Sequence, residues 1–146
     1  MNKVIGYVST RHLAEMREED VRSLDVINIA FGHIVDGKTV WNHPDVKPAL
    51  ARIRSINPQL KIVLSVGGWS ADGFSQAAST KESRKLAADT AKEIVAEYGL
   101  DGIDIDWEYP GTSVAGIASS ADDKVNFTLF LAALREAMDS LGEGKM

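Results

Sequence analysis

Three carboxylates occupy alternate positions in the segment DGIDIDWEYP, residues 101–110. Successive side chains of an extended strand point to opposite faces, so Asp104, Asp106 and Glu108 share one face. The other face carries three large apolar side chains, Ile103, Ile105 and Trp107. The flanking sequence predicts that both faces are covered, which would hold the acids together inside the protein. Such a row indicates acid–base chemistry.

Mutual repulsion is the physical consequence of this row. Side chains two residues apart on a strand lie about 6.5–7 Å from each other. At an effective dielectric constant of about 20, two unit charges at that distance repel by roughly 2.5 kcal/mol, or about 2 pKa units. Burial adds to this cost, so protons are shared along the row. We expect Glu108 to be the general acid, while Asp106 shares a proton with Asp104.

Two other interpretations of the acids stay open. Carboxylates on one strand could bind a divalent cation such as Mg²⁺ or Ca²⁺, or they could form a solvated face without function. Asp101 differs from the row, because Gly102 follows it in a turn-like context before the strand. We expect Asp101 to bond backbone groups and to have a structural role.

The elements that must position these residues alternate along the chain. Strand-like apolar runs cover residues 4–8, 26–31, 61–66 and 103–107, and segments with helical features cover residues 11–24, 44–57, 79–98 and 122–141. Four strand–helix repeats predict a parallel sheet with right-handed crossovers. The pair Asp36-Gly37 predicts a small hairpin excursion at residues 32–41.

The last two helices carry more specific predictions. Ser79-Thr-Lys-Glu82 has the pattern of a capping box, and the helix that it starts is expected to turn Leu86, Ile94 and Tyr98 inward. The apolar stripe of the final helix consists of Phe127, Phe130, Leu131, Leu134, Met138 and Leu141. The tail at residues 142–146 is expected to be frayed or to act as a linker.

Two architectures fit this order of elements: a small, open, doubly wound sheet, or half of a (β/α)8 barrel. In both, functional groups collect at the carboxyl ends of the strands. Those ends carry Tyr7, Phe31, Gly67, Gly68, Trp69, Asp106, Trp107 and Glu108. Aromatic side chains beside glycines and carboxylates favour a carbohydrate cleft, because sugars stack their C–H faces on aromatic rings. An isolated aromatic could equally belong to the core, but Trp69 follows two glycines and is expected to be exposed.

Composition narrows the class of protein. The 146 residues are 45% hydrophobic and 25% charged, which is typical of one globular domain. The net charge of −5 argues against nucleic acid and anionic membranes as partners. There is no cysteine, and therefore no disulfide framework and no thiolate metal site. No apolar run reaches the length of a membrane span, and the sequence begins without the apolar segment and cleavage site of a signal peptide.

At the two motifs, the sequence resembles the family 18 glycoside hydrolases, the chitinases and related endo-N-acetylglucosaminidases. Residues 101–108 (DGIDIDWE) match the family's DxxDxDxE signature, and residues 65–68 (SVGG) match its SxGG signature on the preceding strand. The resemblance covers essentially the whole chain. It implies an α/β fold of the (β/α)8 TIM-barrel type, in which residues 1–146 form the first four β/α units, the N-terminal half of a single domain.

The resemblance also implies roles for the residues of the motifs. Glu108 would protonate the glycosidic oxygen, Asp106 would hydrogen-bond the acetamido N–H of the substrate, and Asp104 would hold Asp106. The attacking group would be the substrate's own acetamido carbonyl oxygen, so the resemblance implies neither a cofactor nor a metal. Residues implied in substrate binding are Trp69, Tyr7, Phe31, Gly68, Trp107 and Tyr109, and those with a structural part in the motifs are Asp101, Ser65 and Gly67.

Two further expectations come from the family. Its non-proline cis peptide bonds would fall at Ala30-Phe31 and Glu108-Tyr109. Its sixth strand supplies a Tyr and its eighth strand a Trp, so a chain with only four β/α units is expected to be inactive alone. The missing barrel half, or a second copy of the chain, is then an expected partner.

The implied activity is hydrolysis of β-1,4-linked N-acetylglucosamine polymers, that is chitin or chito-oligosaccharides, with retention of configuration and with endo action favoured. The alternative is a non-catalytic protein that binds chitin or its oligosaccharides on the same fold. The presence of Glu108 favours the enzyme. The compartment is not given by the sequence, although the family favours secretion.

Overall fold

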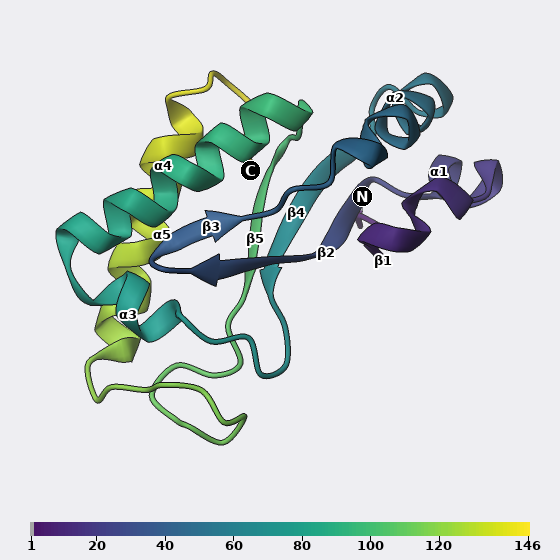
Figure 1. Ribbon diagram of the computed structural model, residues 1–146. Coiled ribbons are helices and arrows are strands. Elements are labelled where there is room, and N and C mark those ends of the chain that lie inside the picture. The colour runs from purple at the N-terminus through teal and green to yellow at the C-terminus, as the bar shows by residue number, and fades with distance from the viewer. Residues whose placement is uncertain (1) are drawn as a thin grey trace.

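The computed structural model describes residues 2–146 and consists of a sheet whose strands alternate with helices (Figure 1). The strands are β1 (Ile5–Ser9), β2 (Val26–Val35), β3 (Lys38–Val40), β4 (Lys61–Gly67) and β5 (Gly102–Asp106). The α-helices are α1 (Glu18–Ser23), α2 (Lys47–Ile56), α3 (Phe74–Ser79), α4 (Lys81–Tyr98) and α5 (Asp123–Asp139). Two 3-10 helices, η1 (Thr10–Glu15) and η2 (Pro44–Val46), precede α1 and α2.

The order of the strands decides between the two predicted architectures. β1, β2, β4 and β5 are parallel neighbours in the order of the chain. Each crossover therefore advances by one strand in the same direction, as in the wall of a (β/α)8 barrel, whereas a doubly wound sheet reverses its strand order at a switch point. The sheet is open, with β1 and β5 at its edges.

The core lies between the sheet and two groups of helices. α1 contacts α2, whereas α3, α4 and α5 pack on one another at the other side of the molecule (Figure 1). β2 is buried at every position from Val26 to Ile29, as predicted for a strand covered on both faces. Full burial of an apolar side chain such as Leu64 or Phe130 stabilises the fold by about 1.5–3 kcal/mol.

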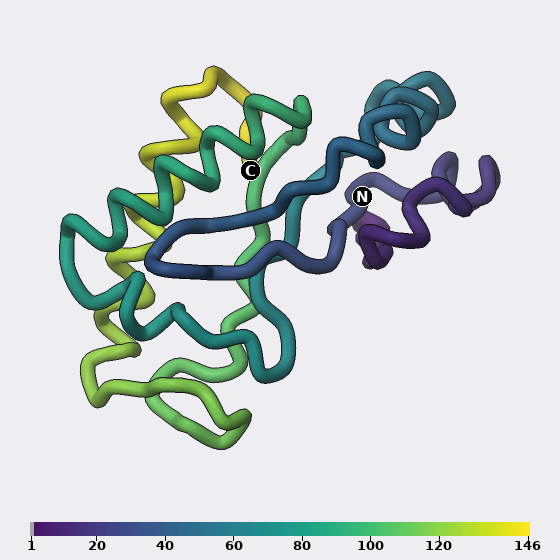
Figure 2. The backbone as a smooth tube through the Cα atoms, viewed as in Figure 1, coloured from purple at the N-terminus to yellow at the C-terminus, as the bar shows by residue number. Residues whose placement is uncertain are grey.

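The hairpin excursion is confirmed. β2 continues past the parallel sheet to Val35 and pairs there with β3 in antiparallel fashion. The turn residues Asp36 and Gly37 both have positive φ, 50° and 74°, as the tight turn of a two-residue hairpin requires. The hairpin extends toward α4 (Figure 2), where the Thr39 N–H donates to Thr90 Oγ1 at 2.9 Å and Thr39 Oγ1 donates to the Ala87 carbonyl at 2.9 Å.

Two helix predictions were wrong in their boundaries. The single helix expected at residues 11–24 is divided into η1 and α1, because Arg17 between them is extended (φ −72°, ψ 151°). The capping box lies one residue later than predicted: Thr80 Oγ1 accepts from the Ser83 N–H at 3.1 Å, and Ser83 Oγ accepts from the Thr80 N–H at 3.0 Å. Ser79 is instead the last residue of α3.

Two predicted inward side chains face outward. Leu86 on α4 is 40% exposed and Leu131 on α5 is 43% exposed. Small side chains explain the first case, because the buried face of α4 presents Ala87, Ala88 and Ala91 to its neighbours. The other predicted inward residues of the two helices are buried or partly buried: Ile94, Tyr98, Phe127, Phe130, Leu134, Met138 and Leu141.

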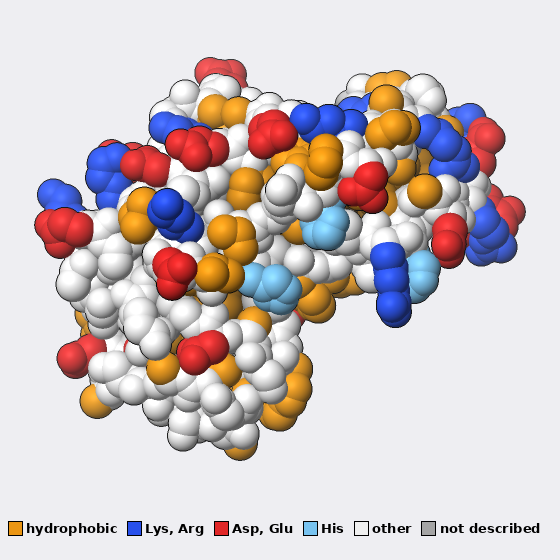
Figure 3. All heavy atoms as spheres, viewed as in Figure 1, with side chains coloured by type: hydrophobic (Ala, Val, Ile, Leu, Met, Phe, Trp, Pro, Cys, Tyr) orange, Lys and Arg blue, Asp and Glu red, His pale blue; other side chains and the backbone are white. Residues whose placement is uncertain are grey.

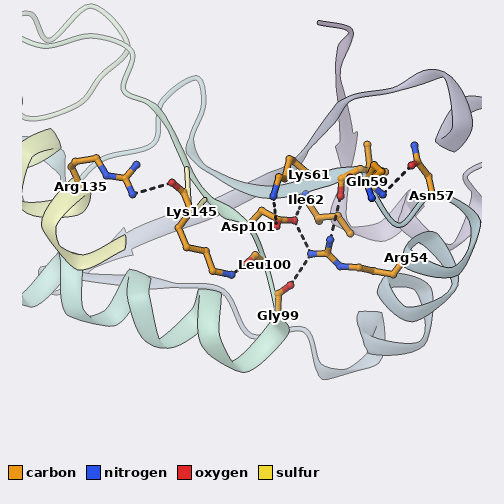
Figure 4. A network of polar contacts seen from close by, with 11 residues as sticks. Arg54, Asn57, Gln59, Lys61, Ile62, Gly99, Leu100, Asp101, Arg135 and Lys145 are labelled. Carbon is orange, nitrogen blue, oxygen red and sulfur yellow. Dashed lines mark hydrogen bonds and ion pairs between the residues drawn. The ribbon is translucent and has the colours of Figure 1, made fainter. Parts of the chain in front are cut away.

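The tail at residues 142–146 is not frayed, contrary to the prediction. The Met146 N–H donates to the Asp101 carbonyl at 2.8 Å, and its carbonyl accepts from the Ile103 N–H at 3.3 Å. Lys145 Nζ donates to the Leu100 carbonyl at 2.6 Å, as Figure 4 shows. The tail is ordered because the edge strand β5 offers unpaired backbone groups to it.

Charges of both signs are interspersed over the surface. Figure 3 shows Lys and Arg side chains next to Asp and Glu side chains over the face in view, without a large patch of one sign. Pairs one helical turn apart, such as Arg22–Glu18 and Lys85–Asp89, account for part of this pattern. Among residues 2–146, none of the helices combines the length and the apolar character that a membrane span requires.

Candidate active site

The register of β4 and β5 brings the two sequence motifs side by side. Ser65 pairs with Asp104 across the two strands, and Gly67 pairs with Asp106. β5 ends at Asp106, and Glu108 follows two residues later. Parallel strands end at the same edge of a sheet, so both motifs lie at the carboxyl edge where barrel enzymes place their functional groups.

Asp104 is held by hydroxyl groups from two other strands. Tyr7 Oη on β1 donates to Asp104 Oδ2 at 2.9 Å, and Ser65 Oγ on β4 donates to the same oxygen at 2.7 Å. Burial raises the pKa of Tyr7, and the Asp104 carboxylate raises it further, against the opposing hydrogen bond from Asn28. Groups on β1 and β4 thus fix one carboxylate of β5, the first member of the row.

Asp106 has the electrostatic setting expected of a shared-proton row. Burial raises the pKa of Asp106, and the nearby charges of Glu108 and then Asp104 raise it further. The three acids are only partly buried, so the expectation that they lie inside the protein was wrong. They lie at the open carboxyl edge of the sheet, where a substrate has access to them.

The two glycines of the SVGG motif allow close approach of neighbouring groups. A Cβ at Gly67, whose φ is 127°, would overlap the Asp106 carbonyl oxygen. At Gly68, φ is 94° and a Cβ would lie 3.1 Å from the Phe31 ring, while its N–H donates to the Asp106 carbonyl at 2.8 Å. The end of β4 therefore holds the backbone of Asp106 directly.

Exposed aromatic side chains surround the row. Trp69 is 62% exposed, which confirms the prediction for this residue, and Tyr7, Phe31 and Tyr109 are also exposed. The rings of Trp69 and Tyr109 meet edge to face with centroids 6.2 Å apart. A shallow groove extends from Trp69 to the hairpin, lined by His33, Asp36, Asp72 and Gln76 among others. Of the exposed aromatic side chains named here, Trp69 lines this groove, and the three acids of the row do not.

Both cis peptide bonds that the resemblance implied are present, at Ala30-Phe31 and Glu108-Tyr109. They lie at the carboxyl edge, one within β2 and one after β5. Tyr109 directly follows Glu108, whose carboxylate raises the pKa of the Tyr109 hydroxyl.

Trp107 is not one of the exposed aromatic side chains, so the prediction that it binds substrate was wrong. Its side chain is only 5% exposed. It stacks on Phe74 with ring centroids 5.5 Å apart and meets Phe127 edge to face at 5.3 Å. The strand alternation explains this, because Trp107 points away from the acids and into the core between α3 and α5.

Asp101 lies at the opposite end of β5 from Glu108. Its Oδ2 accepts from Arg54 Nη2 at 2.7 Å and from the Ile62 N–H at 2.8 Å, and Lys61 Nζ lies 3.4 Å from Oδ1 (Figure 4). Burial works to raise the pKa of Asp101, but the bonds from Ile62 and Arg54 and the charge of Lys61 outweigh burial and lower it. Asp101 ties β5 to β4 and α2, away from the acid row.

Sequence reasoning missed two polar residues near the site. Asn28 is buried in β2 and works to lower the pKa of Tyr7, the donor to Asp104. A single amide in an apolar strand was the available signal. Asp123 is fully buried at the start of α5 and accepts hydrogen bonds from the loop after the row. In the sequence it resembles an ordinary acid in the first turn of a helix.

Known proteins share this arrangement. The model of the family described as glycosyl hydrolases family 18 matches residues 3–146. Chitinase A1 of Niallia circulans is 36% identical in an alignment of 131 positions that covers 80% of this chain and 19% of that protein. A family 18 N-acetylglucosaminidase from Paenibacillus barengoltzii is 51% identical with a TM-score of 0.92, over 97% of this chain and 42% of that one.

The chitinase domain of the spore coat protein CotE from Clostridium difficile is 38% identical with a TM-score of 0.87, over 99% of this chain and 40% of that one. The chain thus spans about a fifth of the first curated relative and about two fifths of these solved chains. The family model matches nearly the full sequence, and the motifs and the strand order agree with it. This chain therefore belongs to family 18 of the glycosyl hydrolases.

Proposed function

We propose that the protein that contains this chain hydrolyses β-1,4-linked N-acetylglucosamine polymers, chitin or chito-oligosaccharides. One observation carries the proposal: Asp104, fixed by two hydroxyls, lies in a row with Glu108 and with Asp106, whose pKa is raised. The names of the relatives, chitinases and an N-acetylglucosaminidase, support this substrate class.

In the proposed reaction, the carboxyl group of Glu108 donates its proton to the glycosidic oxygen. The carbonyl oxygen of the substrate's 2-acetamido group attacks the anomeric carbon as the bond to the leaving sugar breaks. The resulting oxazolinium ion is opened by water, which gives its proton to the Glu108 carboxylate. Two inversions at the anomeric carbon give net retention, without a covalent bond to the enzyme.

Asp106 is proposed to orient the acetamido group through its N–H and to stabilise the positive charge that develops on it. Burial and the neighbouring acids raise the pKa of Asp106, so it can exchange a proton with Asp104 as that charge grows. Asp104 can serve this exchange because Tyr7 and Ser65 keep its carboxylate in place. The row then acts as a unit and not as three separate acids.

The exposed rings of Trp69, Tyr109, Tyr7 and Phe31 are proposed to bind the faces of the sugar units. Endo action is proposed for the whole protein, in which the open groove beside Trp69 would form one part of the cleft. Digestion of a chito-hexaose by the full-length protein tests this directly. Early dimers, trimers and tetramers are expected, and release of monomer alone would show exo action.

The chain is further proposed to be the N-terminal half of one barrel domain, because it matches 42% of a solved family member along 97% of its own length. The rest of the cleft would come from the other half or from a second copy. We expect the isolated chain to show no turnover, and light scattering would show whether it pairs. Secretion is the location proposed for the whole protein.

The central test replaces Glu108 with Gln in the full-length protein. General acid catalysis is worth about 10²–10⁴-fold, so kcat on chito-oligosaccharides should fall by that order. Oligosaccharide binding, measured by calorimetry, should persist because Glu108→Gln keeps the shape of the side chain. Glu93→Gln on the exposed face of α4 is the matched control and should change neither quantity.

Two other functions make different predictions. A non-catalytic binding protein would bind oligosaccharides and show no turnover even with Glu108 intact. A metal-dependent hydrolase would lose its activity to EDTA, whereas the proposed mechanism is insensitive to it. Within residues 2–146, no three Asp, Glu or His side chains converge as a set of metal ligands.

A further inference from the structure

The segment that carries Glu108 is held at both of its ends. It follows β5 and continues through Tyr109 and Pro110 to Gly111, where the long loop before α5 begins (Figure 2). Trp107 directly precedes Glu108 and is buried, whereas Gly111 lies three residues after Glu108, is exposed and has φ 77°. The position of the Glu108 carboxyl group therefore depends on what fixes Trp107 and Gly111.

Aromatic packing fixes Trp107. Trp107 lies between Phe74, the first residue of α3, and Phe127, on the second turn of α5. Phe74 also meets Phe130 of α5 edge to face at 6.4 Å, so the two helices and the indole ring form one cluster. A ring packed on both sides is a rigid starting point for the following residue.

A buried carboxylate, that of Asp123, fixes Gly111. Asp123 Oδ2 accepts from the Gly111 N–H at 3.0 Å and from the Ser120 N–H at 2.8 Å. Asp123 Oδ1 accepts from Ser75 Oγ of α3 at 2.7 Å. One oxygen thus closes both ends of the loop 111–120, and the other oxygen ties that loop to α3.

The environment of Asp123 favours the ionised carboxylate, although the residue is fully buried. Burial works to raise the pKa of Asp123, but the hydrogen bonds from Ser75, Ser120 and Gly111 outweigh burial and lower it. The N-terminus of α5, where Asp123 is the first residue, adds a favourable field. Its bonds to the loop are therefore charge-assisted and stronger than neutral ones.

Both anchors come from the same two helices. Phe74 and Ser75 are adjacent on α3, and Asp123 and Phe127 lie one turn apart on α5. Phe74 and Phe127 contact Trp107 directly. Ser75 and Asp123 bond to each other, and Asp123 also binds the Gly111 N–H. The α3–α5 pair is thus connected to the Glu108 segment before and after the acid.

We infer that Asp123 is a positioning residue for Glu108: by holding Gly111, it sets where the acid's proton is delivered. The inference rests on the proposed function, in which Glu108 protonates the leaving oxygen. It assigns no contact with substrate to Asp123. Displacement of a catalytic group by about 1 Å can cost about 10²-fold in rate, so a loop anchor can affect chemistry without touching it.

The test uses the leaving group, because a phenolate that leaves readily needs little proton donation. The full-length protein and its Asp123→Asn variant would be assayed with phenyl and dinitrophenyl glycosides of one chito-oligosaccharide. Comparison of kcat/KM confines the readout to the steps up to bond cleavage. We expect the variant to lose roughly 10- to 100-fold on the phenyl glycoside and much less on the dinitrophenyl glycoside.

A structural role alone would give a different pattern. Loss of folded protein lowers kcat/KM equally for both substrates, and an equal loss would overturn the inference. Asp122→Asn, at the exposed neighbour, removes the same charge but leaves the backbone bond of Asp122 to Ser120 in place, and should leave both values unchanged. If Asp123→Asn does not fold, Gly111→Ala replaces it, since the added Cβ meets nothing within 4 Å and acts through the positive φ.

Failure of the inference and failure of the proposed function are distinguishable in the same assay. Glu108→Gln defines the leaving-group dependence of an enzyme without its acid. If that variant shows the dependence while Asp123→Asn and Gly111→Ala do not, the proposed function stands and the inference fails. If Glu108→Gln retains normal turnover on both substrates, the proposed acid itself is wrong.

Discussion

The two ends of β5 place the same acidic side chain in opposite electrostatic settings. At the amino end, Asp101 binds Arg54, Lys61 and a backbone N–H, and its pKa is lowered. At the carboxyl end, burial and the nearby carboxylates of Glu108 and Asp104 raise the pKa of Asp106. Among the ion pairs of residues 2–146, none involves the acid row.

This difference separates two tasks within one motif. A carboxylate whose neighbours are cations favours its ionised form and stabilises the fold. One whose neighbours are carboxylates holds protons more tightly and gains nothing for stability from its charge. Only four residues separate Asp101 from Asp106 along the strand direction, so the setting and not the residue type distinguishes the structural acid from the chemical one.

Substitution of Asp106 should show the chemical end most clearly. Asp106→Asn keeps the size of the side chain but removes its charge and its ability to exchange a proton. We expect kcat of the full-length protein to fall by about 10²–10³-fold, as when one electrostatic partner of a transition state is removed. The melting temperature at neutral pH should stay equal or rise, because a carboxylate with a raised pKa is lost. A marked drop in melting temperature would contradict the contrast.

Substitution of Asp101 should give the reverse pattern. Asp101→Asn leaves Arg54 and Lys61 without their partner, and we expect the free energy of unfolding to fall by about 1–3 kcal/mol, since both cations are partly solvated. Turnover per folded molecule should change little. Asp89→Asn, which breaks an exposed pair with Lys85, is the control and should leave stability almost unchanged.

Much of this contrast was accessible from the sequence. Alternation along a strand predicted which face each acid occupies, and Gly102 set Asp101 apart from the row. The SVGG and DGIDIDWE motifs lay on consecutive parallel strands, whose register is regular enough to bring Ser65 to Asp104. The same regularity also predicted that Trp107 points away from the acids, although the family resemblance placed it at the substrate.

What the sequence could not predict depends on packing between distant segments. α3 has only six residues, too few for a clear periodic signal, and it is held by the burial of Phe74. Because α3 ends at Ser79, the N-cap of α4 is Thr80 and not Ser79 as predicted. Asp123 gave no sign of its burial, because its hydrogen-bond partners lie on α3 and on the loop before α5. The cations that bind Asp101 are likewise far from it in sequence.

Acid should affect the two ends in opposite directions. Asp101 has a lowered pKa in the folded state, so its stabilisation is complete above the unfolded value of about 3.9 and is lost as the pH falls further. The deficit of Asp101→Asn relative to the parent protein should therefore begin to shrink below about pH 4 and vanish only once the pH has fallen below the lowered pKa of the folded state. For Asp106, whose folded pKa is raised, ionisation destabilises the fold, so any advantage of Asp106→Asn should disappear as the pH falls to about 4.

Urea unfolding at a series of pH values measures both differences. Each variant is compared with the parent at the same pH, so effects of the other titrating groups cancel. The contrast is sharpened if the Asp101→Asn difference is negative and the Asp106→Asn difference is zero or positive at neutral pH. Two differences of the same negative sign would show that both acids are structural.

The smallest effects should come from the hydroxyls that hold Asp104. Ser65→Ala and Tyr7→Phe each remove one hydrogen bond to Oδ2, worth about 0.5–1.5 kcal/mol or about 2- to 12-fold in rate. Both donors bind the same oxygen, so their losses should not add in the double variant. Kinetics of the two single variants and the double variant form the cycle that measures this coupling. Strictly additive losses would mean that Tyr7 or Ser65 acts on the reaction by a route other than Asp104.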